Sequence, residues 1–417
     1  MKRAGILLAA LGVTMILAGT AFGAGKVTVT LWHGLTAADG QYMEKLMRKY
    51  VSDKNPNIDF QPTAIAWADL YTKMKTAFLS KTLPTLLIFH AQYVPIYADN
   101  AIKPFDDIVG SLKLKDKMLP DFYDMTKFNG KTYYIPMTLV THYTYFWKSD
   151  VVSLGFNAAN PPGTFDALTS YAVKANRVVN GSKVWGIDAG WGYGPWFNQF
   201  LYSNGGKLLS DDGKKAAFNS PAGLAALNLY LDWWYTKQVA PKVETGSFDD
   251  EVKRFVGHGA SAWMTGTSVI GSIDSIGRDN MAYQHSPGLP NAKAGTTAYF
   301  HGFALPRMGS KQADLAALEI VNWMLEPEIN ADFSAGSGQL PGVTAAYNTD
   351  LWRKNGGWLA NNSLDKIKPV PYISHKLRDQ IQESLDKWFN KVRDREITAQ
   401  QGLDGAEKEV NQILASE

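Results

Sequence analysis

Apolar and polar residues alternate along the first part of the chain in the order expected for strands and helices that follow one another. Residues 26–34 alternate in this way and end on a glycine, which predicts a strand. From Met43 onward, apolar residues recur at i, i+3, i+4 and i+7, which predicts a helix with one buried face. Residues 58–65 and 83–90 predict two more strands, with a second helix from residue 67 between them. This order predicts a β-α-β-α-β unit with a parallel sheet.

A second unit of the same kind is expected after residue 160, where a proline turn and Thr164 predict a helix start and residues 184–188 predict a strand. Long extended runs separate the helical blocks, so we expect the chain to cross between the two units near residues 137–142, 299–304 and 343–348. Three further helices are predicted by apolar stripes, whose members are Leu315, Leu318, Val321 and Leu325; Leu377, Ile381, Leu385 and Trp388; and Leu403, Ala406, Val410 and Ile413.

The most unusual segment is the one that runs from Asp188 to Phe200. Trp191, Tyr193 and Trp196 stand there among three glycines and a proline, which favour a loop or a helix start. Flat rings with a polar edge suit the apolar C–H face of a sugar, because they bury much area with little loss of side-chain entropy. Alternatively, the three rings belong to a core beneath a long loop.

The ends of the predicted strands collect further candidate ligand-binding residues. In open α/β sheets, ligands bind beyond the carboxyl ends of the strands. The residues expected at that rim of the first unit are Trp32, His33, Trp67, His90 and Gln92. In the second unit, residues 259–265 predict a short strand that opens into Gly266, Thr267 and Ser268, whose backbone N–H groups and hydroxyls suit a phosphate and a polyol equally.

Composition narrows the class of protein. Residues 1–23 have the charged start, apolar stretch and small-residue cleavage site of a secretory signal, so the mature chain is expected to begin near Ala24. Without the charges of Lys2 and Arg3, the formal charge of +3 falls close to neutrality, which argues against a nucleic-acid partner or an anionic membrane. The chain has no cysteine, so it is not expected to be a lipoprotein or to hold a thiolate metal site. No later apolar run approaches the length of a membrane span, so we expect a protein of the periplasm without membrane insertion.

We find no motif that points to catalysis. The seven histidines, at positions 33, 90, 142, 258, 285, 301 and 375, form no i, i+4 pair for a metal, and there is no G-x-S-x-G motif or P-loop. Neighbouring acids such as Asp106 and Asp107 lie in polar turns and are interpreted as solvated. We therefore expect no catalytic residue, no metal and no cofactor. A secreted carbohydrate-active enzyme remains an alternative, because it would also display tryptophans.

The order of several motifs resembles that of the extracellular solute-binding proteins of ATP-driven importers, in the sugar-binding branch (family 1) that includes maltose-binding and glycerol-phosphate-binding proteins. The motifs are Leu31-Trp32-His33-Gly34, residues 101–107, residues 130–136, residues 161–168, residues 257–264 and residues 339–344. This resemblance implies an α/β, two-lobed periplasmic-binding-protein fold of type II, whose lobes are joined by crossing hinge strands. The implied lobes are residues 24–137 plus 303–345 and residues 138–302 plus 346–417.

The resemblance also implies where a ligand is held. His90 and Gln92 fall where relatives contact sugar after the third strand, and Tyr299, His301 and Gly302 match a strand that lines the cleft. The ligand-binding residues expected in total are Trp32, His33, Trp67, His90, Gln92, Thr138, Trp191, Tyr193, Trp196, Trp263, Gly266, Thr267, Ser268, Tyr299, His301 and Gly302. The chain departs from the family pattern at Pro84-Thr85, which is usually Pro-Asp, and at residues 146–148, which are usually Tyr-Asn-Lys.

These residues favour a neutral ligand. A bound phosphate usually recruits arginine, and the candidate loops contain none. We expect a monomeric substrate-binding component of an ABC transporter that captures a di- or oligosaccharide by hinge closure, with an inner-membrane permease and its ATPase as partners. The alternative ligand is glycerol-3-phosphate or a related phosphorylated polyol.

Overall fold

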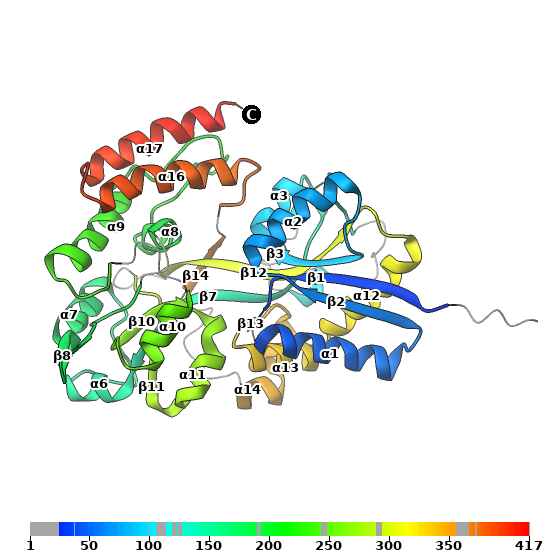
Figure 1. Cartoon of the computed structure of the whole chain (residues 1–417), viewed down its shortest axis with the longest axis horizontal. Coiled ribbons are helices and arrows are strands. Elements are labelled where there is room, and N and C mark those ends of the chain that lie inside the picture. Colours follow the sequence, from blue (N-terminus) through cyan, green and yellow to red (C-terminus); the bar gives the residue numbers. More distant parts are fainter. Residues whose placement is uncertain are drawn as a thin grey trace, which may run out of the picture.

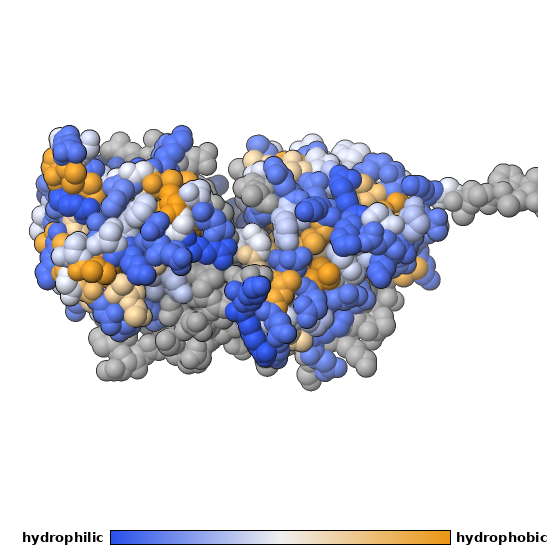
Figure 2. Space-filling model, turned by 90° about the horizontal axis from the view of Figure 1, so that it is seen from below, coloured by the Kyte–Doolittle hydropathy of each residue, from blue (hydrophilic) through white to orange (hydrophobic). Residues whose placement is uncertain are grey.

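The computed structural model places two lobes side by side, joined by long strands (Figure 1). It describes residues 25–36, 38–98, 100–105, 114–118, 123, 127–189, 193–242, 248–288, 294–355, 367–371 and 373–416. In a space-filling view from below, the lobes are separate masses, and hydrophilic residues cover most of the described surface on that side (Figure 2).

The first lobe contains the predicted parallel unit. β1 (Val27–His33) pairs with β2 (Ile58–Ala64) on one side and with β3 (Leu86–His90) on the other, both in parallel. α1 (Ala38–Lys54) and α2 (Trp67–Ser80) make the connections. β3 is buried along its whole length except at His90, as expected for a central parallel strand. The predicted β-α-β-α-β order is confirmed.

Two strands of 13 residues each, β7 (Ile135–Trp147) and β12 (Ala294–Pro306), run from one lobe into the other (Figure 1). They pair in antiparallel register, with Thr138 opposite His301 and Val140 opposite Tyr299. β12 also borders β3, where His301 lies opposite His90. One continuous sheet in the order β10-β7-β12-β3-β1-β2 therefore passes through both lobes.

The second lobe is built on the other half of β7. β10 (Ala262–Gly266) and β11 (Met281–His285) pair with that half in antiparallel fashion. Helices α8 (Tyr193–Ser203), α9 (Pro221–Leu231), α16 (Arg378–Arg393) and α17 (Ala399–Leu414) cover it. The lobe thus takes its C-terminal helices from a segment far along the chain.

The remaining elements are shorter or peripheral. The strands are β4 (Ile102–Lys103), β5 (Lys127–Phe128), β6 (Lys131–Thr132), β8 (Arg177–Val179), β9 (Ser182–Val184), β13 (Leu340–Pro341) and β14 (Ile367–Pro371). The helices are η1 (Ala91–Tyr93), α3 (Val94–Tyr97), α4 (Leu114–Lys117), α6 (Lys148–Ser153), α7 (Phe165–Ala175), η2 (Asp232–Thr236), α10 (Phe248–Val256), η3 (Thr267–Val269), α11 (Ile270–Ile276), η4 (Arg278–Asn280), α12 (Lys311–Met324), α13 (Pro327–Ser337), η5 (Thr344–Asn348) and α14 (Asp350–Asn355).

The buried apolar residues form one large cluster in each lobe. The first cluster runs from Val29 to Leu139 and resumes from Ala298 to Trp352. The second runs from Phe146 to Ala282 and resumes from Ile373 to Leu414, beside a small third cluster around Trp263. Each core therefore joins segments distant in sequence. The lobe boundaries at residues 137/138, 302/303 and 345/346 stay a prediction.

Two sequence-based expectations differ from the structure. Leu315 is 45% exposed, because the buried face of α12 runs through Ala317, Val321 and Met324, and Leu315 points away from it. Residues 343–348 do not form an extended crossing; η5 occupies most of this stretch, and the chain stays with the first core as far as Trp352.

We predict that one tyrosine hydroxyl ties the crossing strand β12 to β3. The Tyr134 hydroxyl lies 2.7 Å from the carbonyl oxygen of Phe89 and 2.6 Å from that of Phe300. The Tyr134→Phe variant should lose about 1–3 kcal/mol of unfolding free energy in urea, because a buried polar contact is removed. Tyr97→Phe is the matched control, since the buried Tyr97 hydroxyl has no hydrogen-bond partner among the described residues. Equal losses in both variants would contradict the prediction.

Candidate ligand-binding site

Aromatic and imidazole rings gather where α2, β3 and β12 meet in the first lobe. The Trp67 ring stacks on His301 at 5.2 Å between centroids, with an angle of 7° between planes, and lies 4.1 Å from His90. The register of β3 against β12 explains this gathering, because it sets His90 directly opposite His301. We call Trp67, Tyr71, His90, Tyr93, Tyr299 and His301 the ring cluster.

Local sequence holds Trp67 in place. Gly34 lies directly beneath its ring, and a Cβ atom at position 34 would come within 2.0 Å of the indole. One turn further along α2, Tyr71 stacks on Tyr93 at 3.8 Å. The Tyr71 hydroxyl also hydrogen-bonds Nδ1 of His90 and accepts the His90 backbone N–H at 3.4 Å. The first lobe thus presents a packed, hydrogen-bonded set of rings.

Rings of the second lobe continue this set through Tyr299. The His142 ring, on β7, lies 6.5 Å from Tyr299 and 4.8 Å from Trp196 of α8. Trp196 is only 1% exposed and belongs to the second core. In this conformation Trp196 is a core residue, as the alternative interpretation of the aromatic segment proposed for it, and a stacking role for it stays a prediction.

Polar groups lie beneath the rings. Oε1 of Gln339 receives the Thr138 hydroxyl and lies 2.9 Å from Nδ1 of His301. Nε2 of His301 and Nε2 of Gln339 are both buried and have no hydrogen-bond partner among the described residues. Buried polar atoms normally find a partner, so two unpaired atoms on adjoining side chains indicate a place for ligand groups.

Arg378, at the start of α16, joins the second lobe to the ring cluster. Its guanidinium carbon lies 4.1 Å from the Tyr93 ring, and its Nε donates to the carbonyl of Ile373 at 3.1 Å. Its Nη1 donates to Asp379 at 3.0 Å, and Asp379 in turn lies 3.4 Å from Lys75 of α2. The candidate loops themselves contain no arginine. In the folded chain, however, Arg378 lies beside the ring cluster.

The imidazoles of the site are neutral near pH 7. Burial lowers the pKa of His142 to about 4. Burial, together with the nearby His301 and Arg378, holds the pKa of His90 well below its usual range. Burial also lowers the pKa of His301, although the hydrogen bond to Gln339 and the charge of Asp39 oppose that shift. The site therefore offers uncharged ring nitrogens at neutral pH.

The structure brings together only part of the predicted set. Trp67, His90, Tyr299 and His301 belong to the ring cluster, and Thr138 and Gly302 adjoin it. Among the described residues, Trp196 reaches it only through His142. Gln92 is half-buried on η1, between His90 and Tyr93.

At the end of β1, the predicted residues Trp32 and His33 contact side chains outside the ring cluster. Lys73 of α2 covers the Trp32 ring at 4.1 Å. His33 is buried and bonds Glu44 of α1 at 3.1 Å. In the described part of the chain, neither makes a hydrogen bond, ion pair or ring contact with the ring cluster.

The remaining predicted residues lie in or near the third core. Trp263 is fully buried and donates to Glu251 at 3.0 Å. Burial and the charge of Asp188 raise the pKa of Glu251 to about 8. Gly266 ends β10, and Thr267 is buried with an unpaired hydroxyl. Trp191 lies outside the described residues, and the side chains of Tyr193 and Ser268 are not described.

Sequence reasoning missed Tyr71, Tyr93, His142, Gln339 and Arg378. Two of them carried a usable signal: Tyr71 lies four residues after Trp67 on one helix face, and His142 lies four residues after Thr138 on one strand face. Arg378 has no local signal, because only the packing of α16 against the first lobe brings it to Tyr93.

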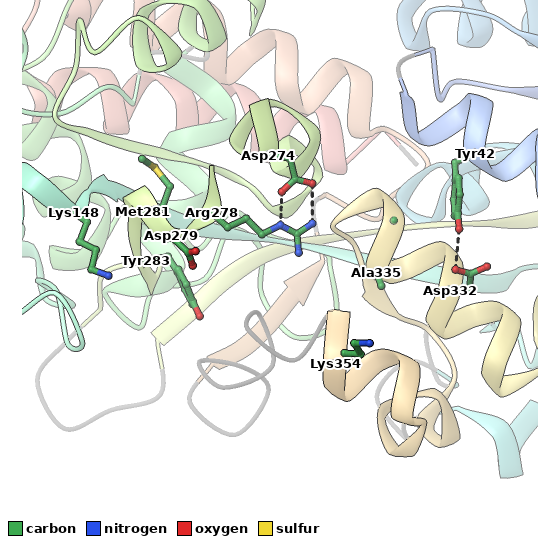
Figure 3. Close-up of a pocket in the computed structure, with 11 residues that line it drawn as sticks. Tyr42, Lys148, Asp274, Arg278, Asp279, Met281, Tyr283, Asp332, Ala335 and Lys354 are labelled. Carbon is green, nitrogen blue, oxygen red and sulfur yellow. Dashed lines mark hydrogen bonds and ion pairs between the residues drawn. The ribbon is translucent and has the colours of Figure 1, made fainter. Parts of the chain in front are cut away.

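A separate cavity of about 760 Å³ lies between the lobes (Figure 3). Tyr42, Asp332 and Lys354 line it from the first lobe, and Lys148, Arg278 and Tyr283 from the second. None of its lining residues belongs to the ring cluster. The helices beside this cavity, α1, α11, α13 and α14, lie below the crossing strands in Figure 1. The helices α2, α8 and α16, which contribute to the ring cluster and the residues next to it, lie above those strands.

Within the described part of the chain, no three His, Asp or Glu side chains meet in a way that could hold a metal ion. Among the same residues, no helix is both long enough and apolar enough to span a membrane.

Comparison with known proteins gives a family match and sequence relatives that cover most of the chain. Residues 45–360 match the family model for bacterial extracellular solute-binding proteins. The sn-glycerol-3-phosphate-binding periplasmic protein UgpB of Escherichia coli K12 is 24% identical over 420 residues, covering 93% of this chain and 92% of the relative.

Solved structures share the fold. The GacH receptor of Streptomyces glaucescens, solved unliganded and with acarbose, superposes with a TM-score of 0.81 at 18% identity, covering 94% of this chain and 99% of that one. The maltose/maltodextrin-binding domain MalE from Bdellovibrio bacteriovorus, bound to maltotriose, gives 0.79 at 18% identity, covering 93% and 99%. The two-lobed α/β binding-protein fold is therefore confirmed.

We predict that acidification destabilises the fold through His142. The pKa of His142 in the folded chain, about 4, lies below the ordinary value of 6.5. Between these two pH values, the unfolded chain binds a proton at His142 and the folded chain does not. The contribution of neutral His142 to the free energy of unfolding is therefore fully present above pH 6.5. It declines as the pH falls towards 4, by an amount on the order of 3 kcal/mol. Urea unfolding of the full chain at several pH values measures this loss. His142→Gln, which cannot titrate, should show a smaller loss over the same range, and an identical loss would refute the assignment.

Proposed function

This chain belongs to the bacterial extracellular solute-binding proteins, a family of non-enzymatic binding proteins, and from that premise we propose that it captures a neutral di- or oligosaccharide between its lobes. It is the solute-binding component of an ABC transporter. The alternative of a secreted carbohydrate-active enzyme is therefore not retained.

The observation that carries the proposal is the ring cluster with its neutral imidazoles. Trp67 and Tyr299 are half-buried and offer flat faces of the kind that stack on the C–H face of a sugar ring. The unpaired nitrogens of His301 and Gln339 add hydrogen-bonding groups for hydroxyls. Apolar faces combined with uncharged polar groups suit a polyhydroxylated, neutral ligand.

Capture by closure is supported by contacts that join the lobes beside the ring cluster. Arg378 of the second lobe lies against Tyr93 of the first, and Asp379 lies 3.4 Å from Lys75. Each lobe alone offers an incomplete site, with His90 and His301 in the first lobe and His142 on the second lobe's side of β7. A ligand that bridges them would shift the population towards the closed form, because only that form satisfies all of its groups.

We place the protein in the periplasm, with an inner-membrane permease and its ATPase as partners. The charged and apolar segments at residues 1–23 support export, and the relative in Escherichia coli is itself periplasmic by name.

A phosphorylated polyol such as glycerol-3-phosphate is the second candidate ligand. Arg378 favours it, because a guanidinium at the edge of the ring cluster could receive a phosphate. The sequence similarity to a glycerol-3-phosphate-binding protein supports the same candidate.

A thermal-shift screen of the mature protein tests the ligand class. We expect stabilisation by one or more of maltose, maltotriose, trehalose, cellobiose and mannobiose, because a ligand that binds only the folded state raises the unfolding temperature. Stabilisation by glycerol-3-phosphate alone would move the assignment to the phosphorylated polyol. Small-angle scattering with the best sugar should show a smaller radius of gyration, and no change would contradict closure.

We predict that Trp67→Ala weakens sugar binding by ~1–3 kcal/mol, because a stacking platform is lost. Isothermal titration with the stabilising sugar measures the change. Trp32→Ala is the control, since Trp32 is a half-buried tryptophan of the same lobe whose ring, among the described residues, stacks on no member of the ring cluster and is covered by Lys73. If both variants retain full affinity, the ring cluster is not the sugar platform.

We predict that Arg378→Gln separates the two candidate ligands. Loss of the guanidinium should abolish any binding of glycerol-3-phosphate, whereas sugar affinity should fall by less than about tenfold, or ~1.4 kcal/mol. Arg393→Gln, at the far end of the same helix, is the control. A sugar affinity that vanishes in Arg378→Gln while the fold remains intact would show that Arg378 is essential for the neutral ligand as well.

A further inference from the structure

Three histidines surround Tyr299 at the junction of the lobes. The ring centroids of His90, His301 and His142 lie 5.1, 5.5 and 6.5 Å from that of Tyr299. Each histidine has its Nδ1 atom in a hydrogen bond with another group of the protein. A neutral imidazole has one donor and one acceptor nitrogen, so the partner of Nδ1 decides what Nε2 can offer.

At His301 the partner is an amide oxygen. Nδ1 lies 2.9 Å from Oε1 of Gln339, and that oxygen can only accept. Nδ1 therefore carries the proton, and Nε2 is an acceptor. The Thr138 hydroxyl donates to the same oxygen.

At His142 the partner is a backbone carbonyl. Nδ1 lies 3.1 Å from the carbonyl oxygen of Thr297, which again can only accept. The Thr297 hydroxyl, 2.8 Å from the same nitrogen, donates its own proton to Gln199 at 2.8 Å and so acts as an acceptor towards the imidazole. Nε2 of His142 is therefore an acceptor as well.

At His90 the polarity is reversed. The Tyr71 oxygen already accepts the backbone N–H of His90, and the acceptor for its hydroxyl proton among the described residues is Nδ1 of His90. Nδ1 is thus an acceptor, and Nε2 of His90 carries the proton and donates.

We propose that these three imidazoles read ligand hydroxyls with fixed polarity, His90 as an N–H donor and His142 and His301 as acceptors. This specificity rests on the proposed sugar-binding function and extends it. A hydroxyl can donate to an acceptor nitrogen, whereas a phosphate or carboxylate oxygen placed there would meet a lone pair instead of a proton. Gln339 acts through His301 as a positioning residue, and its own unpaired Nε2 adds a donor beside the His301 acceptor.

Nitrogen NMR of the ligand-free mature protein tests the polarity directly. With ¹⁵N-labelled histidine at pH 7.5, long-range proton–nitrogen spectra distinguish a protonated Nδ1 from a protonated Nε2, and single His→Gln variants assign the signals. We expect protonated Nδ1 in His142 and His301 and protonated Nε2 in His90. Protonated Nε2 in His301, which would require a turned Gln339 amide, overturns the proposal.

Two variants at Gln339 sharpen the test. In Gln339→Leu, His301 should lose its fixed tautomer and show a mixture, while His90 keeps its own. In Gln339→Glu, the carboxylate should favour protonation of both His301 nitrogens, since it adds a negative charge to that of nearby Asp39. Gln382→Leu, in which the lost amide is the donor to Asp386 of α16 at 2.9 Å, is the matched control and should leave all three signals unchanged.

Titration of maltose, maltotriose, trehalose and mannobiose completes the experiment. Any of these that binds the unchanged protein should bind Gln339→Leu at least tenfold more weakly and Gln382→Leu equally well. If Gln339→Leu binds the sugar as tightly as the unchanged protein, the proposal that the imidazoles recognise ligand hydroxyls is wrong. Expected tautomers in a protein that no sugar stabilises would contradict the proposed ligand class and leave the polarity of the three rings standing.

Discussion

The antiparallel pairing of β7 with β12 is the constraint on which the rest of the structure depends. Both strands pass through the two lobes, and almost every residue of β7 is buried. At Gly302 the strands approach so closely that a Cβ atom would lie 2.3 Å from the carbonyl oxygen of Ile135. The pairing register shifts between His301 and Gly302, and this fixes which side chains face one another across the junction. A larger residue at position 302 would force the strands apart and move His301 with them.

This pairing places the candidate site on rigid elements. His90 and His301 come from adjacent strands of one sheet, and His142 lies on the same strand as Thr138, which holds the amide of Gln339. Side chains held by a sheet keep their orientation when loops move, so the hydrogen-bonding polarity of the three rings is set before a ligand arrives. The contributions that can move with the second lobe come from helices, namely Trp196 of α8 and Arg378 of α16.

Sequence patterns predicted the strands of the first lobe, the crossing strands, and the meeting of Trp67 with His90, because these depend on local periodicity and on the carboxyl ends of parallel strands. The expectation for His301 came from the resemblance to the family. The patterns failed where packing between distant segments decides the outcome. For Trp196, the neighbouring glycines left a ligand platform and a core position both open, and α8 buries the ring in this conformation. Leu315 fits a helical stripe, yet α12 turns a neighbouring face to the core. Arg378 and Gln339 reach the site from segments more than 200 residues from His90, and no spacing rule connects them.

Arg378 favours an anionic ligand and the neutral histidines a neutral one, and the surroundings of Arg378 resolve this difference. The positive charge of Arg378 is balanced by Asp379, and its face is taken up by the Tyr93 ring, so an anion at this position would compete with a carboxylate already 3.0 Å away. Among the described residues, no carboxylate hydrogen-bonds any of the three imidazoles, and burial keeps them uncharged. Arg378 forms an ion pair with Asp379 and stacks on the Tyr93 ring. These contacts stabilise the contact between the lobes independently of the charge of a ligand. The charge balance of the site thus favours a ligand that brings hydroxyls instead of a net charge.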